Sequence, residues 1–168
     1  MKILICEPIE EEVIELLRQS FEVELEGELK NTDSDIIIVR SKTKVTKEII
    51  ESARNLKIIG RPGVGIDNID VKIAEKKGVK VINTPEALTE SVAELAVGLM
   101  FSLARKIPQV HINIRSGKWL KRELKGIELS KKTLGILGHG NIGRRVIEIC
   151  DDIGMKIIYW SRNRKFDL

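Results

Sequence analysis

Three glycines with the spacing G-x-G-x-x-G, Gly138, Gly140 and Gly143, are the residues of this chain best suited to hold an anion. The first permits a tight turn, the second has no side chain to keep the backbone from a phosphate group, and the third lets a helix pack close to the preceding strand. An anion at such a turn binds the free N–H groups of the helix N-terminus and is favoured by the helix dipole. This chemistry suits the diphosphate of a dinucleotide, provided that a strand precedes the glycines and a helix follows them.

The residues after the next expected strand bear on which dinucleotide could bind. A free ribose 2′-hydroxyl is usually bound by an Asp or Glu at the tip of that strand, about 20 residues beyond the glycines. This chain has Ser161, Arg162 and Arg164 there instead, with no acid at the tip. Guanidinium groups offer a planar fork of donors that matches phosphate oxygens, which favours NADP over NAD. The alternative is that the segment is only a solvated basic turn.

The segments around the glycines have the periodicity that the motif needs. An apolar strand precedes Gly138, and residues 155–160 are expected to form a second strand. The helix between them should turn its apolar side chains inward: Ile142, Val146, Ile149, Cys150 and Ile153. Residues 133–168 thus predict the first βαβ unit of a Rossmann dinucleotide-binding domain, truncated before the further strands of a complete domain. Such a sheet would leave a parallel edge for another chain to cover.

The first half of the chain alternates strand and helix signals, which predicts an α/β class with a mainly parallel sheet. We expect a flavodoxin-like domain over residues 1–90, with strands at 2–6, 21–25, 35–39, 57–60 and 79–82 and helices at 10–19, 47–53 and 71–77. The segment 91–132 is expected to hold a long helix, a shorter helix near 110–115 and a linker. Ser91 and Glu94 have the spacing of a capping box at the start of the long helix.

Composition and charge argue against several classes of function. The 168 residues are 42% hydrophobic and 32% charged, as in globular proteins, and no apolar run approaches the about 20 residues of a membrane helix. Basic residues are dispersed and aromatic residues make up only 4%, so nucleic-acid binding is not expected. The net charge of +4 suits an anionic cofactor and an anionic small-molecule substrate.

The N-terminus begins a strand without a signal-peptide pattern, so we expect a cytoplasmic protein. In that compartment Cys6 and Cys150 are expected to be small buried apolar residues rather than a disulfide or a nucleophile. No metal site is predicted.

Further motifs, in order along the chain, resemble those of the D-isomer-specific 2-hydroxyacid dehydrogenases. They are Val39–Thr46, Gly60–Asp70, Asn83–Pro85, Ser91–Leu95, Ala104–Gln109, Ser116–Trp119 and Gly126–Leu129. Several motifs in this order are far more specific than the glycines alone, and the resemblance covers essentially the whole chain. It implies an N-terminal substrate-binding domain, a cofactor domain after the long helix, and an active site between the two.

The resemblance also implies where the substrate binds. In the loop Gly63-Val64-Gly65 the backbone N–H groups would face the substrate carboxylate, with Val64 also near the nicotinamide. Glycines on both sides of one residue let successive amides converge on an anion, although they would equally suit a plain turn. Arg40 and Ser41, expected at the carboxyl end of a strand, are implied as further contacts to the substrate; a solvated loop is the alternative.

Two residues of the glycine-rich turn depart from the family pattern. Asn141 and Ile142 correspond to residues that lie along the diphosphate, but the family often has Arg where Asn141 stands; an Asn there could still cap the helix. His139 replaces an apolar residue, and its imidazole is expected to meet the phosphates rather than the substrate.

The family transfers a hydride between a nicotinamide and C2 of a 2-hydroxy or 2-oxo acid. A His acts as acid and base, a Glu orients it, and an Arg binds the carboxylate. In the family all three lie beyond the last residue of this sequence, and neither His111 nor His139 matches the catalytic position. We therefore assign no catalytic residue to this chain and expect it not to be competent alone.

Three functions are left open. The first is the N-terminal portion of an NAD(P)-dependent oxidoreductase of D-2-hydroxy acids. Its other portion would be supplied by a second polypeptide or be missing. The most similar members oxidise 3-phosphoglycerate, while Ser161 and Arg162 favour reduction of glyoxylate or hydroxypyruvate. The second is a non-catalytic nucleotide-binding or interaction module, and the third is an inactive remnant. A homodimer is expected, because the family's long helix, here over 91–105, lies near its dimer interface.

Overall fold

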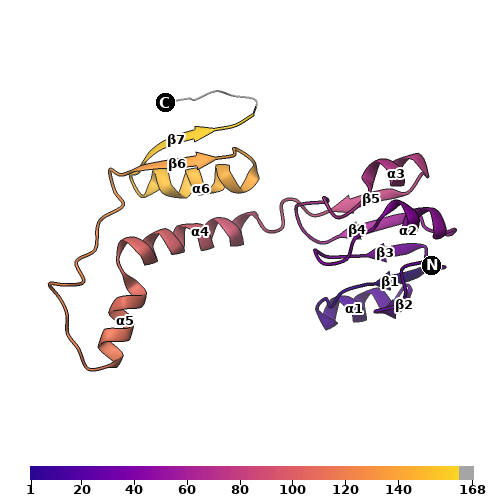
Figure 1. The fold of residues 1–168 in the computed structure, drawn as a ribbon, viewed down its shortest axis with the longest axis horizontal. Helices are drawn as coiled ribbons and strands as arrows, with labels where there is room; N and C mark the ends of the chain where they lie inside the picture. Colours follow the sequence, from indigo (N-terminus) through magenta and orange to yellow (C-terminus); the bar gives the residue numbers. More distant parts are fainter. Residues whose placement is uncertain (163–168) are drawn as a thin grey trace. The chain divides into compact units, whose positions relative to one another are not determined.

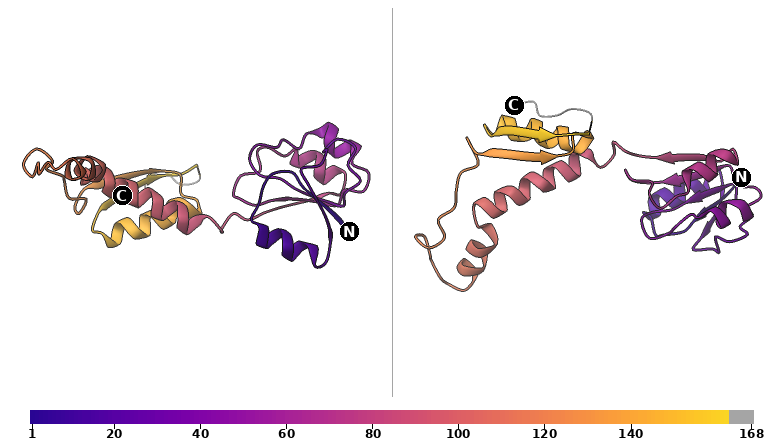
Figure 2. Two further views of the ribbon diagram at one scale, coloured as in Figure 1. Left: turned by 90° about the horizontal axis from the view of Figure 1, so that it is seen from below. Right: turned by 45° about the horizontal axis from the view of Figure 1, so that its top comes forward.

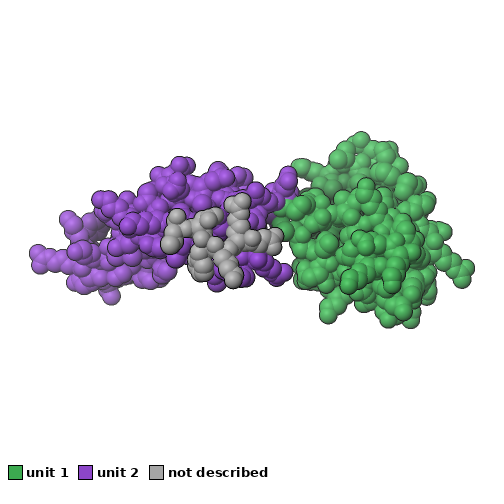
Figure 3. Space-filling model, turned by 90° about the horizontal axis from the view of Figure 1, so that it is seen from above, with its two compact units in different colours: residues 1–85 green, residues 86–168 purple. Residues whose placement is uncertain are grey.

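The computed structural model describes residues 1–162, and the chain divides into two compact units, Met1–Pro85 and Glu86–Leu168 (Figure 3). We call them the N-terminal unit and the C-terminal unit and describe each by itself.

The N-terminal unit is a five-stranded parallel sheet with helices on both faces (Figure 1). Its strands are β1 (Lys2–Ile5), β2 (Glu22–Leu25), β3 (Ile36–Ile38), β4 (Ile58–Arg61) and β5 (Lys80–Asn83). They lie in the order β2-β1-β3-β4-β5, and every pair is parallel. This order is that of flavodoxin-like folds, which confirms the predicted fold class.

The apolar residues of the strands pack on both faces of this sheet, as expected for a parallel sheet covered by helices. Ile3 and Ile5 of β1 pack with Ile14 of α1 (Glu11–Arg18) on one face. Ile37 and Ile59 lie in the second core, which α2 (Lys47–Ser52) and α3 (Val71–Lys76) cover on the other face (Figure 2). Helices α1, α2 and α3 follow β1, β3 and β4, whereas β2 leads to β3 without a helix.

The C-terminal unit joins two helices to one strand–helix–strand unit. It comprises α4 (Thr89–Ala104), α5 (Ile107–Arg115), β6 (Thr133–Leu137), α6 (Asn141–Asp152) and β7 (Lys156–Trp160). Strands β6 and β7 are parallel, and α4 and α6 share the core beside them: Ala93, Val97, Val146, Cys150 and Met155. The inward face predicted for α6 is confirmed, since Ile142, Ile149 and Ile153 also pack against this core.

Within residues 1–162, the opposite face of the β6–β7 pair carries exposed side chains. Leu137, at the end of β6, is 91% exposed, and Trp160 beside it in register is 42% exposed. A two-stranded sheet is too small to be stable by itself, so the packing of α4 and α6 against it must stabilise this unit.

The helix starts differ from the predictions. The capping box is wrong, because α4 begins at Thr89 with Leu88 at its N-cap, and Ser91 lies inside the helix with no side-chain cap. A backbone turn in which the Thr89 N–H donates to the Glu86 carbonyl begins the helix two residues earlier. Likewise α5 begins at Ile107 rather than near 110, because Pro108 suits a first turn, where N–H groups need no acceptor.

The two cysteines are free. Burial, with a smaller contribution from the Glu7 charge, raises the pKa of the Cys6 thiol to about 12, and burial also raises the pKa of Cys150. Thiolates are disfavoured at both positions, in keeping with the expectation that neither is a nucleophile. Within residues 1–162, no helix is long and apolar enough to cross a membrane.

Candidate functional site

The three glycines form the turn between β6 and α6, and their surroundings explain the spacing. Gly138 has φ +111°, a conformation that L side chains rarely adopt. A Cβ on Gly143 would lie 2.2 Å from the Gly138 carbonyl oxygen, so this close approach of helix and turn requires a glycine. A Cβ on Gly140 would meet nothing within 4 Å, because this position faces open space. The backbone therefore has the geometry that each predicted role requires.

The N-terminus of α6 offers the donors that a diphosphate needs. Gly140 is the N-cap, and the first amide to bond within the helix is that of Arg144, which donates to the Gly140 carbonyl at 2.9 Å. The N–H groups of Asn141, Ile142 and Gly143 precede it and have no intrahelical acceptor. Together with the dipole of a helix of 12 residues, they make this end attractive to an anion.

Asn141 does not cap the helix, contrary to that expectation. Its Oδ1 accepts a hydrogen bond from Arg144 Nη2 at 2.7 Å, because Gly140 rather than Asn141 occupies the N-cap position. The His139 ring stacks on Tyr159 of β7, with centroids 4.3 Å apart and 18° between the planes. This contact ties the turn to the second strand and could not be foreseen from residue spacing.

A pocket of 570 Å³ lies at the carboxyl ends of β6 and β7. It is lined by Leu137, Gly138, His139, Gly140, Trp160, Ser161 and Arg162. It thus brings together residues that the sequence analysis assigned to the cofactor from two separate segments: Gly138 and Gly140 before α6, and Ser161 and Arg162 after β7. Open space beside Gly140, amide donors and a guanidinium fit a dinucleotide phosphate. Arg164 lies outside the described residues.

The substrate residues predicted in the N-terminal unit all lie at one edge of its sheet. Arg40 and Ser41 follow β3, and the loop Gly63-Val64-Gly65 follows β4. The strand order reverses between β1 and β3, and open α/β sheets bind ligands at the carboxyl edge near such a switch point. This edge is therefore the candidate anion site of the unit.

The loop Gly63-Val64-Gly65 offers fewer free amides than the resemblance implied. The Gly63 N–H already donates to Thr84 Oγ1 at 2.9 Å, and Asn83 Nδ2 donates to the Val64 carbonyl at 2.8 Å. Within the described part of the chain, the N–H groups of Val64 and Gly65 have no acceptor and remain for an anion. Thr84 and Asn83 had been noted only as part of a motif, and their role as supports of this loop was missed.

Arg61 is a further residue whose role was not predicted from the sequence. Its Nη1 would lie 3.2 Å from a Cβ on Gly63, so this glycine makes room for the guanidinium, whereas a Cβ on Gly65 would lie 2.8 Å from Asp67 Oδ1. Its Nε is buried and has no hydrogen-bond partner in the described residues. A positive charge thus lies against the loop whose amides are free. An Arg at the end of a strand, directly before a glycine loop, was the available signal.

The segment Arg40–Thr43 is held by two other side chains. Glu7, just after β1, accepts hydrogen bonds from the backbone N–H groups of this segment, and Asn68 donates to two of its carbonyls. Arg40 is exposed, and its Nη1 donates to the Pro8 carbonyl at 3.2 Å. The segment is a fixed loop at the sheet edge, so the solvated-loop alternative describes its side chains but not its backbone.

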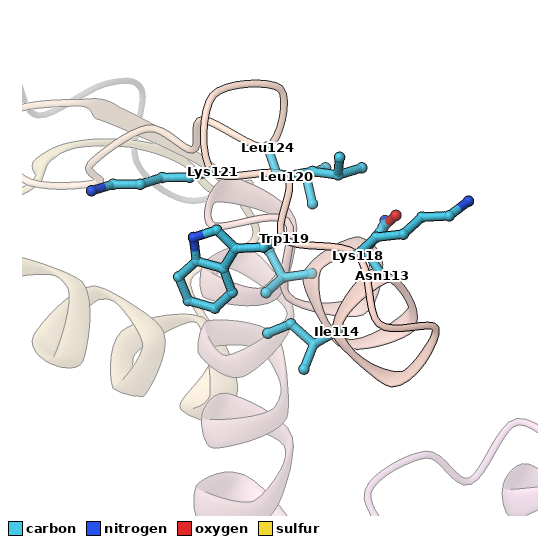
Figure 4. Close-up of a pocket in the computed structure, with 8 residues that line it drawn as sticks. Asn113, Ile114, Lys118, Trp119, Leu120, Lys121 and Leu124 are labelled. Carbon is cyan, nitrogen blue, oxygen red and sulfur yellow. The ribbon is translucent and has the colours of Figure 1, made fainter.

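A further pocket, of 230 Å³, lies between α5 and the segment that follows it (Figure 4). Its lining is mainly apolar and includes Val110, Ile114, Trp119, Leu120 and Leu124, with Lys118 and Lys121 as its charged residues. It holds no acid–base pair. Within residues 1–162, no group of three or more His, Cys, Asp or Glu side chains could hold a metal ion.

The parallel sheet of the N-terminal unit and the glycine turn between β6 and α6 define an α/β protein with a Rossmann-like βαβ unit. The sequence matches the family described as D-isomer specific 2-hydroxyacid dehydrogenase, catalytic domain, over residues 3–162, and the chain belongs to that family.

Relatives within the family are similar over nearly all of this chain. D-3-phosphoglycerate dehydrogenase of Methanocaldococcus jannaschii is 47% identical; the match covers 94% of this chain and 32% of the dehydrogenase. Hydroxypyruvate reductase of Thermotoga maritima is also 47% identical; the match covers 95% of this chain and 55% of the reductase. The solved structure of an acyclic imino acid reductase (Bsp5) in complex with NADPH and D-Arg has a TM-score of 0.84 at 29% identity; the match covers 98% of this chain and 57% of that chain. The chain thus spans between a third and just over half of the length of these relatives.

Proposed function

We propose that this chain binds NAD(P) at the turn before α6 and a D-2-hydroxy acid or 2-oxo acid at the carboxyl edge of the N-terminal sheet. It would do so as the N-terminal portion of an NAD(P)-dependent oxidoreductase. The observation that carries the proposal is the open space at Gly140, the N-cap of α6, where a Cβ would meet nothing within 4 Å beside the free amides of the helix.

The residues of this chain would bind and orient the reactants. A bound nicotinamide supplies the hydride acceptor or donor. The amides of Asn141, Ile142 and Gly143 would hold the diphosphate. The amides of Val64 and Gly65, with the nearby charge of Arg61, would hold the substrate carboxylate.

Arg40 and Ser41 are proposed as contacts to a second polar group of the substrate. No residue is proposed as the acid or base, because the relatives extend well beyond the portion matched here.

The substrate proposed first is 3-phosphoglycerate, supported by the 47% identity to the Methanocaldococcus enzyme named for it. Hydroxypyruvate is the second candidate, supported by the equally similar Thermotoga relative. Ser161 and Arg162, which line the pocket at the end of β7, support NADP as the preferred cofactor. The similar structure solved in complex with NADPH is consistent with that preference.

Titration of the chain with NADPH and NADH tests the cofactor proposal. Trp160 lines the pocket, so both calorimetry and quenching of its fluorescence should report binding. NADPH should bind more tightly than NADH. Arg162→Ser should weaken NADPH binding by about 10- to 100-fold, since a hydrogen bond to a charged group is lost, and leave NADH binding unchanged. Tighter binding of NADH by the unaltered chain would overturn the preference, and no binding of either would overturn the proposed function.

An assay of turnover tests the assignment of roles. The chain alone, mixed with NADPH and hydroxypyruvate or with NAD and 3-phosphoglycerate, should bind these compounds without converting them. Turnover by this polypeptide would show that its own residues handle the proton, and would refute the assignment of binding and orienting roles only.

A further inference from the structure

We propose that Glu7 is a positioning residue for substrate binding: its carboxylate fixes the backbone of Arg40–Thr43 so that Arg40 and Ser41 stand at the switch point of the sheet. The proposal rests on the proposed function, because it assumes that an anionic substrate binds at this edge.

Glu7 gathers three backbone amides of one loop on a single carboxylate. Oε1 accepts from the Arg40 N–H at 2.8 Å and from the Thr43 N–H at 2.9 Å, and Oε2 accepts from the Lys42 N–H at 3.2 Å. Glu7 follows β1 and the loop follows β3, which are neighbours in the sheet, so this contact spans the switch point. Three converging donors leave the loop backbone little freedom to take another course.

Asn68 holds the same loop through its carbonyls. Its Nδ2 donates to the Arg40 carbonyl at 2.8 Å and to the Thr43 carbonyl at 2.6 Å. Asn68 follows shortly after Gly65, so it connects the Arg40–Thr43 loop to the segment that carries the free amides of Val64 and Gly65. Glu7 and Asn68 together bond three N–H groups and two carbonyls of the Arg40–Thr43 loop.

A carboxylate is the side chain that this position requires. A negative charge close to an anion site is unfavourable unless nearby donors neutralise it, and here the loop amides do so. A carboxamide has one acceptor oxygen, and its NH2 group would face an amide N–H. Gln at position 7 can therefore keep only part of the contacts, and Asp keeps the charge on a side chain one methylene shorter.

The ionisation of Glu7 shows that the carboxylate form is favoured. Burial opposes the charge, but the hydrogen bonds from Thr43, Arg40 and Lys42 outweigh it and lower the pKa of the carboxyl from its ordinary 4.5. The stabilisation is therefore present above pH 4.5 and is lost as the pH falls through the lowered pKa. Cys6 is a titratable neighbour, since the Glu7 charge helps to raise the pKa of its thiol, and Arg40 and Lys42 are charged residues whose backbone N–H groups donate to Glu7.

Hydrogen exchange of the full chain tests the role of Glu7 in the loop. The amides of Arg40, Lys42 and Thr43 should exchange at least about tenfold faster in Glu7→Gln than in the unaltered chain, because their acceptor is weakened. Glu7→Asp should show intermediate exchange. Glu15→Gln, a matched loss of charge on the exposed face of α1, should leave these amides unchanged.

Two comparisons separate a local role from general destabilisation. The core amide of Ile59 should keep its protection in Glu7→Gln, since the sheet does not depend on this side chain. Protection of the three loop amides should fall as the pH drops below 4.5 in the unaltered chain and be independent of pH there in Glu7→Gln. Unchanged loop protection, or equal loss at Ile59, would overturn the positioning role.

Binding of 3-phosphoglycerate connects this role to function. Its dissociation constant, followed by the amide shifts of Val64 and Gly65, should rise about tenfold in Glu7→Gln and be unchanged in Glu15→Gln. Equal affinity in all three chains would refute the positioning role. Absence of binding to the unaltered chain would refute 3-phosphoglycerate as substrate, and the exchange result would still decide whether Glu7 fixes the loop.

Discussion

At the scale of single residues, the glycines of this chain serve two different physical needs. Gly143 is required by close packing, because a Cβ there would overlap a backbone oxygen. Gly140 has open space around it and an N-cap conformation of φ −84° and ψ −169°, which any residue can adopt. Only a ligand in that space would require a glycine at position 140.

Alanine at each of these two positions should therefore give different results. Gly143→Ala should lower the free energy of unfolding by about 1–3 kcal/mol, as expected for overpacking against backbone. Gly140→Ala should change it by less than about 0.5 kcal/mol but should weaken NADPH binding, because its methyl group occupies the proposed diphosphate site. Urea unfolding and calorimetric titration would measure the two effects. Full NADPH affinity in Gly140→Ala would contradict the assignment of this turn.

At the scale of elements, short helices depend on contacts from outside. Helix α2 has six residues, and Lys77, just after α3, donates its Nζ to the carbonyls of Ile50, Glu51 and Ala53 at its end. No N–H group of the helix donates to these last carbonyls, so the Lys77 ammonium satisfies them and its positive charge complements the helix dipole.

Lys77→Met keeps most of the side-chain length and removes these hydrogen bonds. It should lower the free energy of unfolding of the N-terminal unit by about 1 kcal/mol, since the side chain is largely exposed. Urea unfolding followed by circular dichroism would measure this change. Lys76→Met, the same substitution at the neighbouring position, serves as control, and equal effects of both variants would argue against the cap.

Helix α4 carries an exposed apolar stripe as well as its buried face. Leu95, Leu99 and Leu103, each four residues apart, are 62%, 60% and 80% exposed. Exposed apolar stripes of this kind are typical of association surfaces, which supports the proposed homodimer.

Leu99→Lys should convert a dimer to a monomer without loss of helix content. Sedimentation equilibrium and circular dichroism would measure the two properties. Leu16→Lys, at a residue of α1 that is 62% exposed, provides the control and should leave the mass unchanged. A monomeric mass for the unaltered chain would contradict the dimer.

At the scale of the whole molecule, the two units have separate cores. The N-terminal unit buries residues on both faces of five strands, while the C-terminal unit depends on two strands and the packing of α4 with α6. Because the described part of the C-terminal unit has a sheet of only two strands, this unit should be the less stable of the two.

Both tryptophans, Trp119 and Trp160, belong to the C-terminal unit, which allows the two stabilities to be measured in one chain. Tryptophan fluorescence should change at a lower urea concentration than circular dichroism at 222 nm, and residues 1–85 expressed alone should unfold in a single cooperative transition. Coincident transitions in the full chain would show instead that the two units unfold together.

The sequence by itself determined the class of fold, the element types and the position of the glycine turn. These follow from local rules: apolar periodicity distinguishes strands from helices, and a glycine that must adopt φ +111° is visible as a glycine. The motif order was equally visible and led to the family that the comparison over residues 3–162 confirms.

Only the tertiary structure decided which side chains hold the loops at the carboxyl edge of the N-terminal sheet. Glu7 is far in sequence from the Arg40–Thr43 loop, and Thr84 is far from Gly63, yet parallel pairing brings the carboxyl ends of their strands together. The start of α4, by contrast, follows from a local backbone turn between Glu86 and Thr89 and not from the capping box. Spacing along a chain encodes neighbours within one element, whereas contacts between elements depend on sheet order and register, which no local pattern contains.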